Sequence, residues 1–251
     1  MDLTLAKFPK SRPELPARHR AVYEREYALN RSGRGPLYAA VAKLEGWMHH
    51  AIAARKPNGP ILELGTGGLN HLSFEAGVSE YDVCEPLADL LLNKPLPPQV
   101  RTVLKDYREL GNLERGYSKI LSIAVLEHLE HLPYVVAQSA LLLAPAGVFQ
   151  AGIPSEGGAL WGLSWRLSTG LAYRLRTGLD YGILMRHEHI NTADEIEAIV
   201  RRFFADVKVR RFPFDAKHLS MYTYLEGTNP RREECTNFVT DYAARLGWNK
   251  Q

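Results

Sequence analysis

The chain has 251 residues, of which 45% are hydrophobic, 10% aromatic and 24% charged, and its formal net charge is +3. This composition excludes a disordered chain, a collagen-like chain and a small disulfide-stapled fold. The charge excess is too small to indicate nucleic-acid binding. Cys84 and Cys235 are expected to be buried, reduced thiols. Because the sequence shows neither a signal-peptide core nor a membrane-spanning apolar run, it predicts a cytoplasmic protein.

Residues 1–59 are predicted to form an N-terminal arm and helices that pack on the rest of the protein. Prolines and charges dominate the arm, and a short helix is expected over residues 18–29. Residues 31–35 then interrupt the helical pattern. Pro36 suits the first turn of a second helix, which the sequence KPNG at residues 56–59 ends.

Residues 60–251 are predicted to form one α/β domain. Short apolar segments indicate strands at residues 60–64, 81–84, 100–104, 119–125 and 148–153, with helical patterns between them, one of which covers residues 131–143. Strands that alternate with helices predict a doubly wound, mostly parallel sheet with right-handed crossovers.

The pattern changes after the fifth strand. Residues 154–190 form an insertion rich in glycine, tryptophan and arginine. A helix follows to Phe203, with Thr192 as its N-cap and Glu195 completing a capping box. Residues 207–214 and 219–225 predict a hairpin, and the remaining residues predict a turn and a surface helix.

The segment ILELGTGG at residues 61–68 is the strongest functional signal, because a strand runs into a glycine turn that opens a helix. Glycines are needed where a turn is tight and where backbone approaches a ligand closely. Glu85 ends the next strand, where an acid accepts hydrogen bonds from ribose hydroxyls. Asp106 ends the third strand and could accept one from an exocyclic amine. Parallel strands end at one sheet edge, so these groups predict one ligand site.

Two cofactor classes share a glycine turn and an acid. The dinucleotide fingerprint G-x-G-x-x-G needs a glycine where this chain has Asn70. Glu63, just before the turn, would repel a pyrophosphate but attract a sulfonium or an amino group. The charges therefore favour S-adenosylmethionine over a nicotinamide dinucleotide.

At this point the sequence resembles the class I S-adenosylmethionine-dependent methyltransferases, in their small-molecule (type 11-like) subgroup. The resemblance covers about residues 60–154, more loosely to 225, and rests on ELGTGG, YDVCEP, LKDYREL, SIAVLEHLEHL and LLAPAGVFQAGIPSEG. It departs at Leu69, which replaces a third glycine, and at Ser118, which replaces an acid. It implies a Rossmann-like, seven-stranded, mostly parallel sheet with a terminal antiparallel hairpin. Residues 60–251 would be the methyltransferase domain, with residues 154–190 as a cap over the acceptor site.

The resemblance also implies, position by position, which residues bind the cofactor S-adenosyl-L-methionine, which becomes S-adenosyl-L-homocysteine as product. The first motif would line the methionine part, Glu85 would hold the ribose diol, and Asp106 would meet the adenine amine with Tyr107 packed on the ring. The implied cofactor-binding residues are Glu63, Gly65, Thr66, Gly67, Glu85, Pro86, Asp106, Tyr107 and Ala124.

Methyl transfer to a hydroxyl needs a base for the acceptor's proton, and histidine is suited to that task. His128 follows the fourth strand, and His187 and His189 lie at the return from the insertion. In an extended segment the latter two would point the same way, so both or neither would face the site. We take His128 and His189 as the catalytic candidates. The alternatives are a helix-start role for His128 and a surface-loop role for His189. The spacing does not match H-E-x-x-H, so no metal is predicted.

The insertion should decide the acceptor. Its leucines recur every four residues and predict one helical stripe: Leu163, Leu167, Leu171 and Leu175. The plainest interpretation is a cap helix that packs on the sheet edge. The alternatives are an aromatic platform for a sugar or ring, arginines that bind a phosphate or carboxylate, or a membrane-surface helix for a lipid-linked acceptor.

The sequence thus predicts a methyltransferase that uses S-adenosylmethionine, with a small-molecule or glycan hydroxyl as acceptor. The alternatives are N-methylation of a small amine and cofactor binding without catalysis, and a nicotinamide-dependent oxidoreductase is less favoured. The predicted partners include no nucleic acid, and a membrane only if the acceptor is lipid-linked. The chain is expected to be a monomer or a homodimer.

Overall fold

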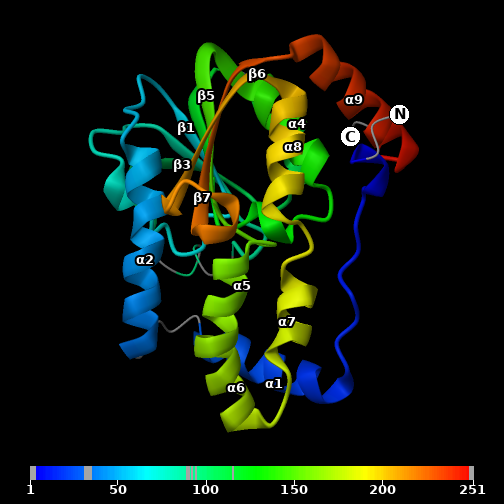
Figure 1. The fold of residues 1–251 in the computed structure, drawn as a ribbon. Helices are drawn as coiled ribbons and strands as arrows, with labels where there is room; N and C mark the ends of the chain where they lie inside the picture. The colour runs from blue at the N-terminus through cyan, green and yellow to red at the C-terminus, as the bar shows by residue number, and fades with distance from the viewer. Residues whose placement is uncertain are drawn as a thin grey trace.

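The structure is a computed structural model that describes residues 4–30, 36–88, 91, 93, 95–114 and 116–248, with residues 26–30 and 36–43 described by their backbone. Residues 31–35, where the sequence predicts a break between helices, lie outside the described residues. Figure 1 shows a central sheet with helices on both faces and a group of helices that extends beyond one end of the strands.

Seven strands form one sheet in the order β3-β2-β1-β4-β5-β7-β6. The strands are β1 (Ile61–Leu64), β2 (Tyr81–Cys84), β3 (Val100–Leu104), β4 (Tyr117–Ile123), β5 (Leu143–Pro154), β6 (Phe204–Pro213) and β7 (Ser220–Pro230). The pairs among β1 to β5 are parallel, whereas β7 runs antiparallel to both β5 and β6. The predicted fold class, including the terminal hairpin, is confirmed.

Helices cover both faces of the sheet (Figure 1). One face packs against α2 (Pro36–Ala53), and the other against α4 (Leu132–Leu142) and α8 (Ala193–Phe203), with α9 (Arg232–Arg245) packed on α4. Successive residues of β1 serve opposite faces: Ile61 packs with Ile52 of α2, and Leu62 joins the core on the α4 side. A strand buried on both faces needs a continuous apolar run, which is the pattern that predicted these strands.

The start of α8 follows its sequence signal. Thr192 is the N-cap, its hydroxyl accepts the Glu195 backbone N–H at 3.3 Å, and the Glu195 carboxylate accepts the Thr192 backbone N–H at 3.0 Å. The predicted capping box is therefore confirmed. Short helical turns connect the remaining elements: η1 (Leu5–Lys7), η2 (Leu72–Phe74), η3 (Tyr107–Asn112), η4 (Leu126–His128) and η6 (Lys217–Leu219).

The insertion folds into helices that extend from the carboxyl ends of the strands, beside α1 (Ala17–Asn30) (Figure 1). Its elements are α5 (Ala159–Trp165), a π-helical turn η5 (Arg166–Gly170), α6 (Leu171–Thr177) and α7 (Tyr181–Glu188). Tyr173 and Leu184 are buried in it together with Leu15 from the N-terminal arm. The first cap helix, α5, does contact β7, but the leucines of the predicted stripe are exposed. The interpretation that the stripe is the packing face is therefore wrong.

Both cysteines are free and buried, as predicted. No helix in the described part of the chain combines the length and apolar character that a bilayer crossing needs.

Candidate functional site

The glycine turn after β1 is shaped by a close contact with the chain that leaves β4. Gly65 has a φ of +71°, and a Cβ atom there would lie 2.3 Å from a methyl group of Val125. Only glycine fits both the left-handed backbone and this contact. Leu69 also has a positive φ, of 63°. The backbone thus adopts the left-handed conformation that a third glycine would favour, at a cost of roughly 1–2 kcal/mol for leucine.

Glu85 holds the turn from the end of β2. Its side chain is 6% exposed, and its two oxygens accept the backbone N–H groups of Gly67 at 2.8 Å and Leu87 at 3.0 Å. A carboxylate has about four lone-pair sites, so these two bonds leave it able to accept hydroxyl donors as well. This geometry is compatible with the predicted ribose contact, which stays a prediction.

Glu63 lies deeper than the turn that it precedes. It is 3% exposed, and its Oε2 accepts hydrogen bonds from the hydroxyls of Thr66 and Tyr81. Burial raises the pKa of Glu63. Because both bonds are made inside the protein, Glu63 fixes the turn from beneath, and Thr66 is held by this bond.

Asp106 and Tyr107 lie where the sequence placed them, after β3. Asp106 caps η3 through the backbone N–H of Arg108 and also accepts the Arg108 Nε at 2.8 Å, which lowers the pKa of Asp106. An adenine amine at this carboxylate would therefore share it with Arg108. Asp106, Tyr107 and His128 line one cavity of about 580 Å³, within the size range of small-molecule sites.

The two remaining predicted cofactor residues flank these groups. Pro86 is exposed directly after Glu85. Ala124 has a φ of 52° at the end of β4, and its N–H donates to the Gly152 carbonyl at 2.8 Å. Left-handed conformations at residues other than glycine cost energy and are common at functional sites.

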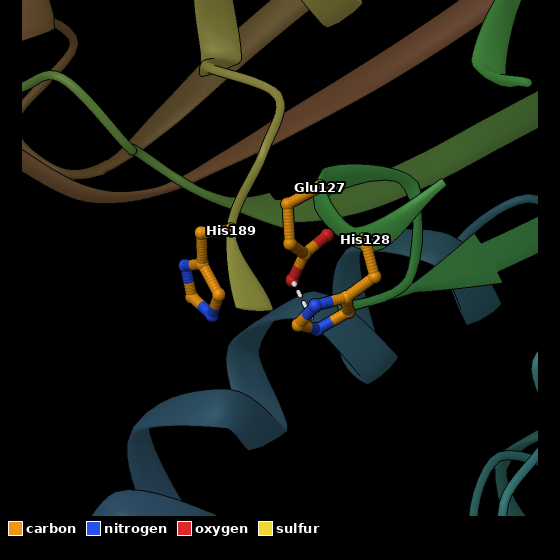
Figure 2. Close-up of side chains that lie close together, drawn as sticks. All are labelled: Glu127, His128 and His189. Carbon is orange, nitrogen blue, oxygen red and sulfur yellow. Dashed lines mark ion pairs between the residues drawn. The ribbon is translucent and has the colours of Figure 1, made fainter. Parts of the chain in front are cut away.

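The structure brings His128 and His189 together with Glu127 (Figure 2). The two imidazole rings lie edge to face with their centroids 4.9 Å apart, and His128 Nε2 is 3.8 Å from Glu127 Oε1. His128 Nδ1 lies 2.7 Å from the Glu188 carbonyl oxygen, which can only accept, so this nitrogen is the donor. His189 Nδ1 lies 2.9 Å from Glu156 Oε2, which already accepts the Trp161 N–H. These Nδ1 contacts fix the orientation of both rings and leave the Nε2 atoms available to contact a ligand.

The cluster is held by a buried asparagine. Asn191 is fully buried, and its side-chain amide donates to the carbonyls of Leu126 and Leu129 at 2.9 and 2.8 Å. The Glu127 carbonyl in turn accepts the backbone N–H groups of Ile190 and Asn191. These bonds attach the segment after α7 to η4, which fixes His189 beside His128.

The N-terminal arm supports the same segment from outside. Arg12 donates to the carboxylate of Glu188 at 3.3 Å and to the His128 carbonyl at 3.4 Å. Lys10 donates to the Ile190 carbonyl at 2.7 Å, and Tyr23 of α1 donates to Glu188. The arm is therefore part of the framework that positions both candidate histidines.

Glu127 is the most deeply buried member of the cluster. It is 2% exposed, its Oε2 has no partner among the described residues, and burial raises its pKa to about 7. The ligand atoms of Glu127, His128 and His189 lie within 4.8 Å of one another, so these residues could hold a metal ion. The spacing of the histidines predicts no metal, and a chelator would test that prediction.

His187 does not join the cluster. Its Nδ1 bonds the Pro13 carbonyl at 2.7 Å, and its ring packs against Tyr23. The expectation that both or neither of His187 and His189 face the site is therefore wrong. The segment is the end of helix α7 rather than extended chain, and helical geometry sends residues two apart in different directions.

A second polar cluster lies buried behind the glycine turn. His71 contacts His49 at 3.0 Å and Glu75 at 3.0 Å, and Lys119 of β4 donates to Glu75 at 2.6 Å. Burial and the neighbouring His71 lower the pKa of His49 to about 4, so His49 is neutral near pH 7. His71, which follows the glycine turn in sequence, thereby has a structural role between α2 and the sheet.

The site residues that sequence reasoning missed are partners of the predicted ones: Glu127, Glu156, Glu188 and Arg12. Glu127 directly precedes His128 and Glu188 directly precedes His189, so proximity in sequence was a signal for these two. Glu156 and Arg12 come from distant segments, and no sequence pattern connects them to the histidines.

Comparison with models of known protein families gives no match, and comparison with curated protein sequences gives none either. Solved structures do match. The plantazolicin methyltransferase BpumL, in complex with S-adenosylhomocysteine, aligns with a TM-score of 0.55 and 11% identity over 90% of this chain and 94% of its own. The N-methyltransferase NodS of Bradyrhizobium japonicum, in complex with the same product, aligns at 0.51 and 12% identity over 80% and 91%.

The [4+2]-cyclase SpnF also aligns, with a TM-score of 0.54 and 12% identity over 88% of this chain and 99% of its own. The chain therefore has the Rossmann-like fold of class I methyltransferases, as the sequence resemblance implied. Since one similar structure is a cyclase, the fold alone does not determine the reaction, which must be argued from the site.

Proposed function

We propose that the chain is a methyltransferase that uses S-adenosyl-L-methionine and methylates a hydroxyl group of a small molecule or a glycan. This proposal rests on the contact between the glycine turn and the segment that carries the histidine cluster. The glycine turn at Gly65 packs on Val125, and η4 with Glu127 and His128 begins at the next residue. The turn would hold the methyl donor, and the cluster would face the acceptor.

The residues of the glycine turn suit this cofactor. Two glycines with positive φ let the backbone approach a ligand, Glu85 keeps acceptor capacity beside them, and Glu63 adds a carboxylate below the turn. This charge is compatible with a sulfonium and unfavourable for a pyrophosphate. When bound, S-adenosylmethionine supplies a methyl group activated by its bond to a positively charged sulfur.

His128 and His189 are the proposed catalytic residues on the acceptor side. An acceptor hydroxyl that takes up the methyl group would lose its proton, and His128 Nε2 would accept that proton. The Glu188 carbonyl keeps the proton on Nδ1 and so leaves Nε2 as the acceptor. His189, held by Glu156, would orient the same hydroxyl. Positioning and general base catalysis are the two contributions that this transfer needs from the protein.

N-methylation of a small amine is the second candidate. Three carboxylates surround the histidines, namely Glu127, Glu156 and Glu188, and they would attract a cationic amine. Glu156 and Glu188, however, already accept hydrogen bonds from His189 and Arg12. Glu127 carries only part of its charge near pH 7, because burial raises its pKa to about 7. The site therefore offers a cationic amine less negative charge than three carboxylates would suggest.

The test is transfer of a labelled methyl group to a panel of sugar hydroxyls, phenols and amines, with and without a chelator. We expect transfer to a hydroxyl that the chelator does not affect. Transfer to amines alone would favour the second candidate, and loss of transfer with the chelator would make the cluster a metal centre. Cofactor binding without transfer to any acceptor would indicate that the chain binds the cofactor without catalysing a reaction. In this account residues 60–251 remain the methyltransferase domain, with residues 154–190 as its acceptor cap.

A further inference from the structure

The leucine stripe (Leu163, Leu167, Leu171 and Leu175) lies on the outer side of the cap. These side chains are 54%, 65%, 48% and 80% exposed, although leucine is among the residues most often buried. In an α-helix of 3.6 residues per turn, a four-residue repeat drifts by about 40° at each step. The wider π-helical turn at Arg166–Gly170 offsets this drift and keeps the four leucines on one side.

The opposite side of the same helical segment is already packed. Tyr173 is 3% exposed and lies among Leu179, Leu184 and Leu15, and the ring of Trp165 lies 5.9 Å from that of Tyr181. The segment is therefore apolar on both its inner and its outer side. A surface helix that faces water normally carries polar residues outside. The four leucines therefore form an exposed apolar surface that a contact outside the chain would cover.

The charges around the stripe are positive. Residues 154–190 contain four arginines, all exposed, and three acidic residues. Two of the acids, Glu156 and Glu188, are bonded to His189 and Arg12, so only Asp180 remains beside the stripe. Arg166 lies over the ring of Trp165 at 4.5 Å and Arg176 over that of Tyr173 at 5.9 Å. Exposed leucines flanked by arginines match an anionic lipid surface, because the apolar side chains enter the interface while the guanidinium groups meet lipid phosphates.

A second copy of the chain fits this surface less well. In a two-fold dimer the same patch meets itself, so the arginines of one copy would face those of the other with one aspartate each to offset them. The position of the stripe also fits a membrane. It begins two residues after Trp161, whose ring stacks 6.3 Å from His189, and Leu219, 55% exposed, lies on η6 against α5. The apolar surface therefore starts beside the histidine cluster.

We propose that the leucine stripe and its flanking arginines dock the cap on an anionic membrane surface, where the helix lies in the interface without crossing the bilayer. The docking itself does not depend on the reaction. A consequence that rests on the proposed function is that the acceptor hydroxyl belongs to an amphiphilic molecule, which reaches His128 and His189 from the membrane.

The test is flotation of the full chain with vesicles of phosphatidylcholine alone and of phosphatidylcholine with phosphatidylglycerol. We expect binding to the anionic vesicles that falls as salt rises. The triple variant Leu167→Gln/Leu171→Gln/Leu175→Gln should lower the partition coefficient at least about tenfold. Arg174→Gln should lower it about fivefold. Leu44→Gln, which alters an exposed leucine on α2, is the matched control and should bind like the unchanged chain.

Two results would overturn the proposal. One is the absence of binding to either vesicle type, and the other is a dimer in sedimentation velocity that the triple variant dissociates, which would make the stripe an interface between copies. Calorimetry with S-adenosylmethionine, run on the same samples without lipid, tests the proposed function separately. Unchanged cofactor affinity in the triple variant would also show that the variant is folded.

Discussion

The proposed cofactor side and the proposed acceptor side of this site are built in different ways. On the cofactor side, the turn after β1 is held by backbone contacts to Glu85, one strand away, and by Glu63 from the strand itself. On the acceptor side, each histidine depends on groups from remote parts of the chain, such as Arg12, whose partner Glu188 lies 176 residues away. The cofactor side is therefore positioned by local backbone geometry. The acceptor side is positioned only when several distant segments of the chain have folded together.

This difference predicts how each side fails when it is altered. Substitutions on the cofactor side should change binding and folding, because the turn is both the proposed ligand site and a junction in the core. Substitutions on the acceptor side should spare binding and change turnover.

The largest effect is expected on the acceptor side. His128→Ala should lower the rate of methyl transfer about a hundredfold or more, because the acceptor's proton loses its base, while the affinity for S-adenosylmethionine stays unchanged. Steady-state kinetics and calorimetry on one preparation would measure both. The matched control is His187→Ala, because His187 contacts Pro13 and Tyr23 instead of the cluster. If His128→Ala transfers methyl groups at the normal rate, the base is His189 or water.

On the cofactor side, Gly65→Ala should be the most damaging change. The new methyl group would meet Val125 at 2.3 Å in a backbone with a φ of +71°. We expect a loss of about 2–4 kcal/mol in the free energy of unfolding, from overpacking and left-handed strain together. Denaturant titration would measure it.

Gly77→Ala separates overpacking from backbone strain. Gly77 has a φ of +80°, but among the described residues other than its chain neighbours no atom lies within 4 Å of the added Cβ. It should cost only about 1 kcal/mol, the backbone part of the effect. Equal losses at the two positions would show that the contact with Val125 is not important.

Glu85→Ala should weaken binding of S-adenosylmethionine by about 1–3 kcal/mol, because it removes a charged hydrogen-bond acceptor. Isothermal calorimetry would show it as a higher Kd. Glu80→Ala is the control, because Glu80 lies at the opposite end of β2, where it pairs with Arg101 on the surface. Equal affinities for the unchanged chain and Glu85→Ala would remove Glu85 from the site.

The remaining expected effect concerns the pH dependence of stability and Glu127. Its pKa is raised from 4.5 to about 7 by burial, so the folded state binds the proton more tightly than the unfolded state. Its contribution to stability is therefore complete below about pH 4.5 and is lost as the pH rises through 7. The unchanged chain should lose on the order of 2–3 kcal/mol relative to Glu127→Gln between pH 5 and pH 8. Parallel stability curves for the two proteins would contradict a buried, proton-binding Glu127.

Local signals were sufficient to predict much of the fold. The apolar run of β1, the capping box of α8 and the hairpin of β6 and β7 each follow from residues close together in sequence. The same holds for Glu85, whose position is set by the spacing from one strand end to the next.

Features that depend on the third dimension were not predictable in this way. A four-residue leucine repeat indicates a helix but does not say which side faces solvent, and the structure exposes the side that seemed to be the packing face. The extended geometry assumed for His187 and His189 was wrong because α7 continues to Glu188. The bond from His189 to Glu156 joins two ends of the insertion, and only folding brings those ends together.

The central claim is that the acidic strand ends and the glycine turn bind S-adenosylmethionine. The most direct test is a calorimetric titration of the unchanged chain with S-adenosylmethionine and, separately, with a nicotinamide dinucleotide. We predict saturable binding of the sulfonium compound at one site per chain and no binding of the dinucleotide. Binding of the dinucleotide without the sulfonium compound would contradict the assignment of the whole site.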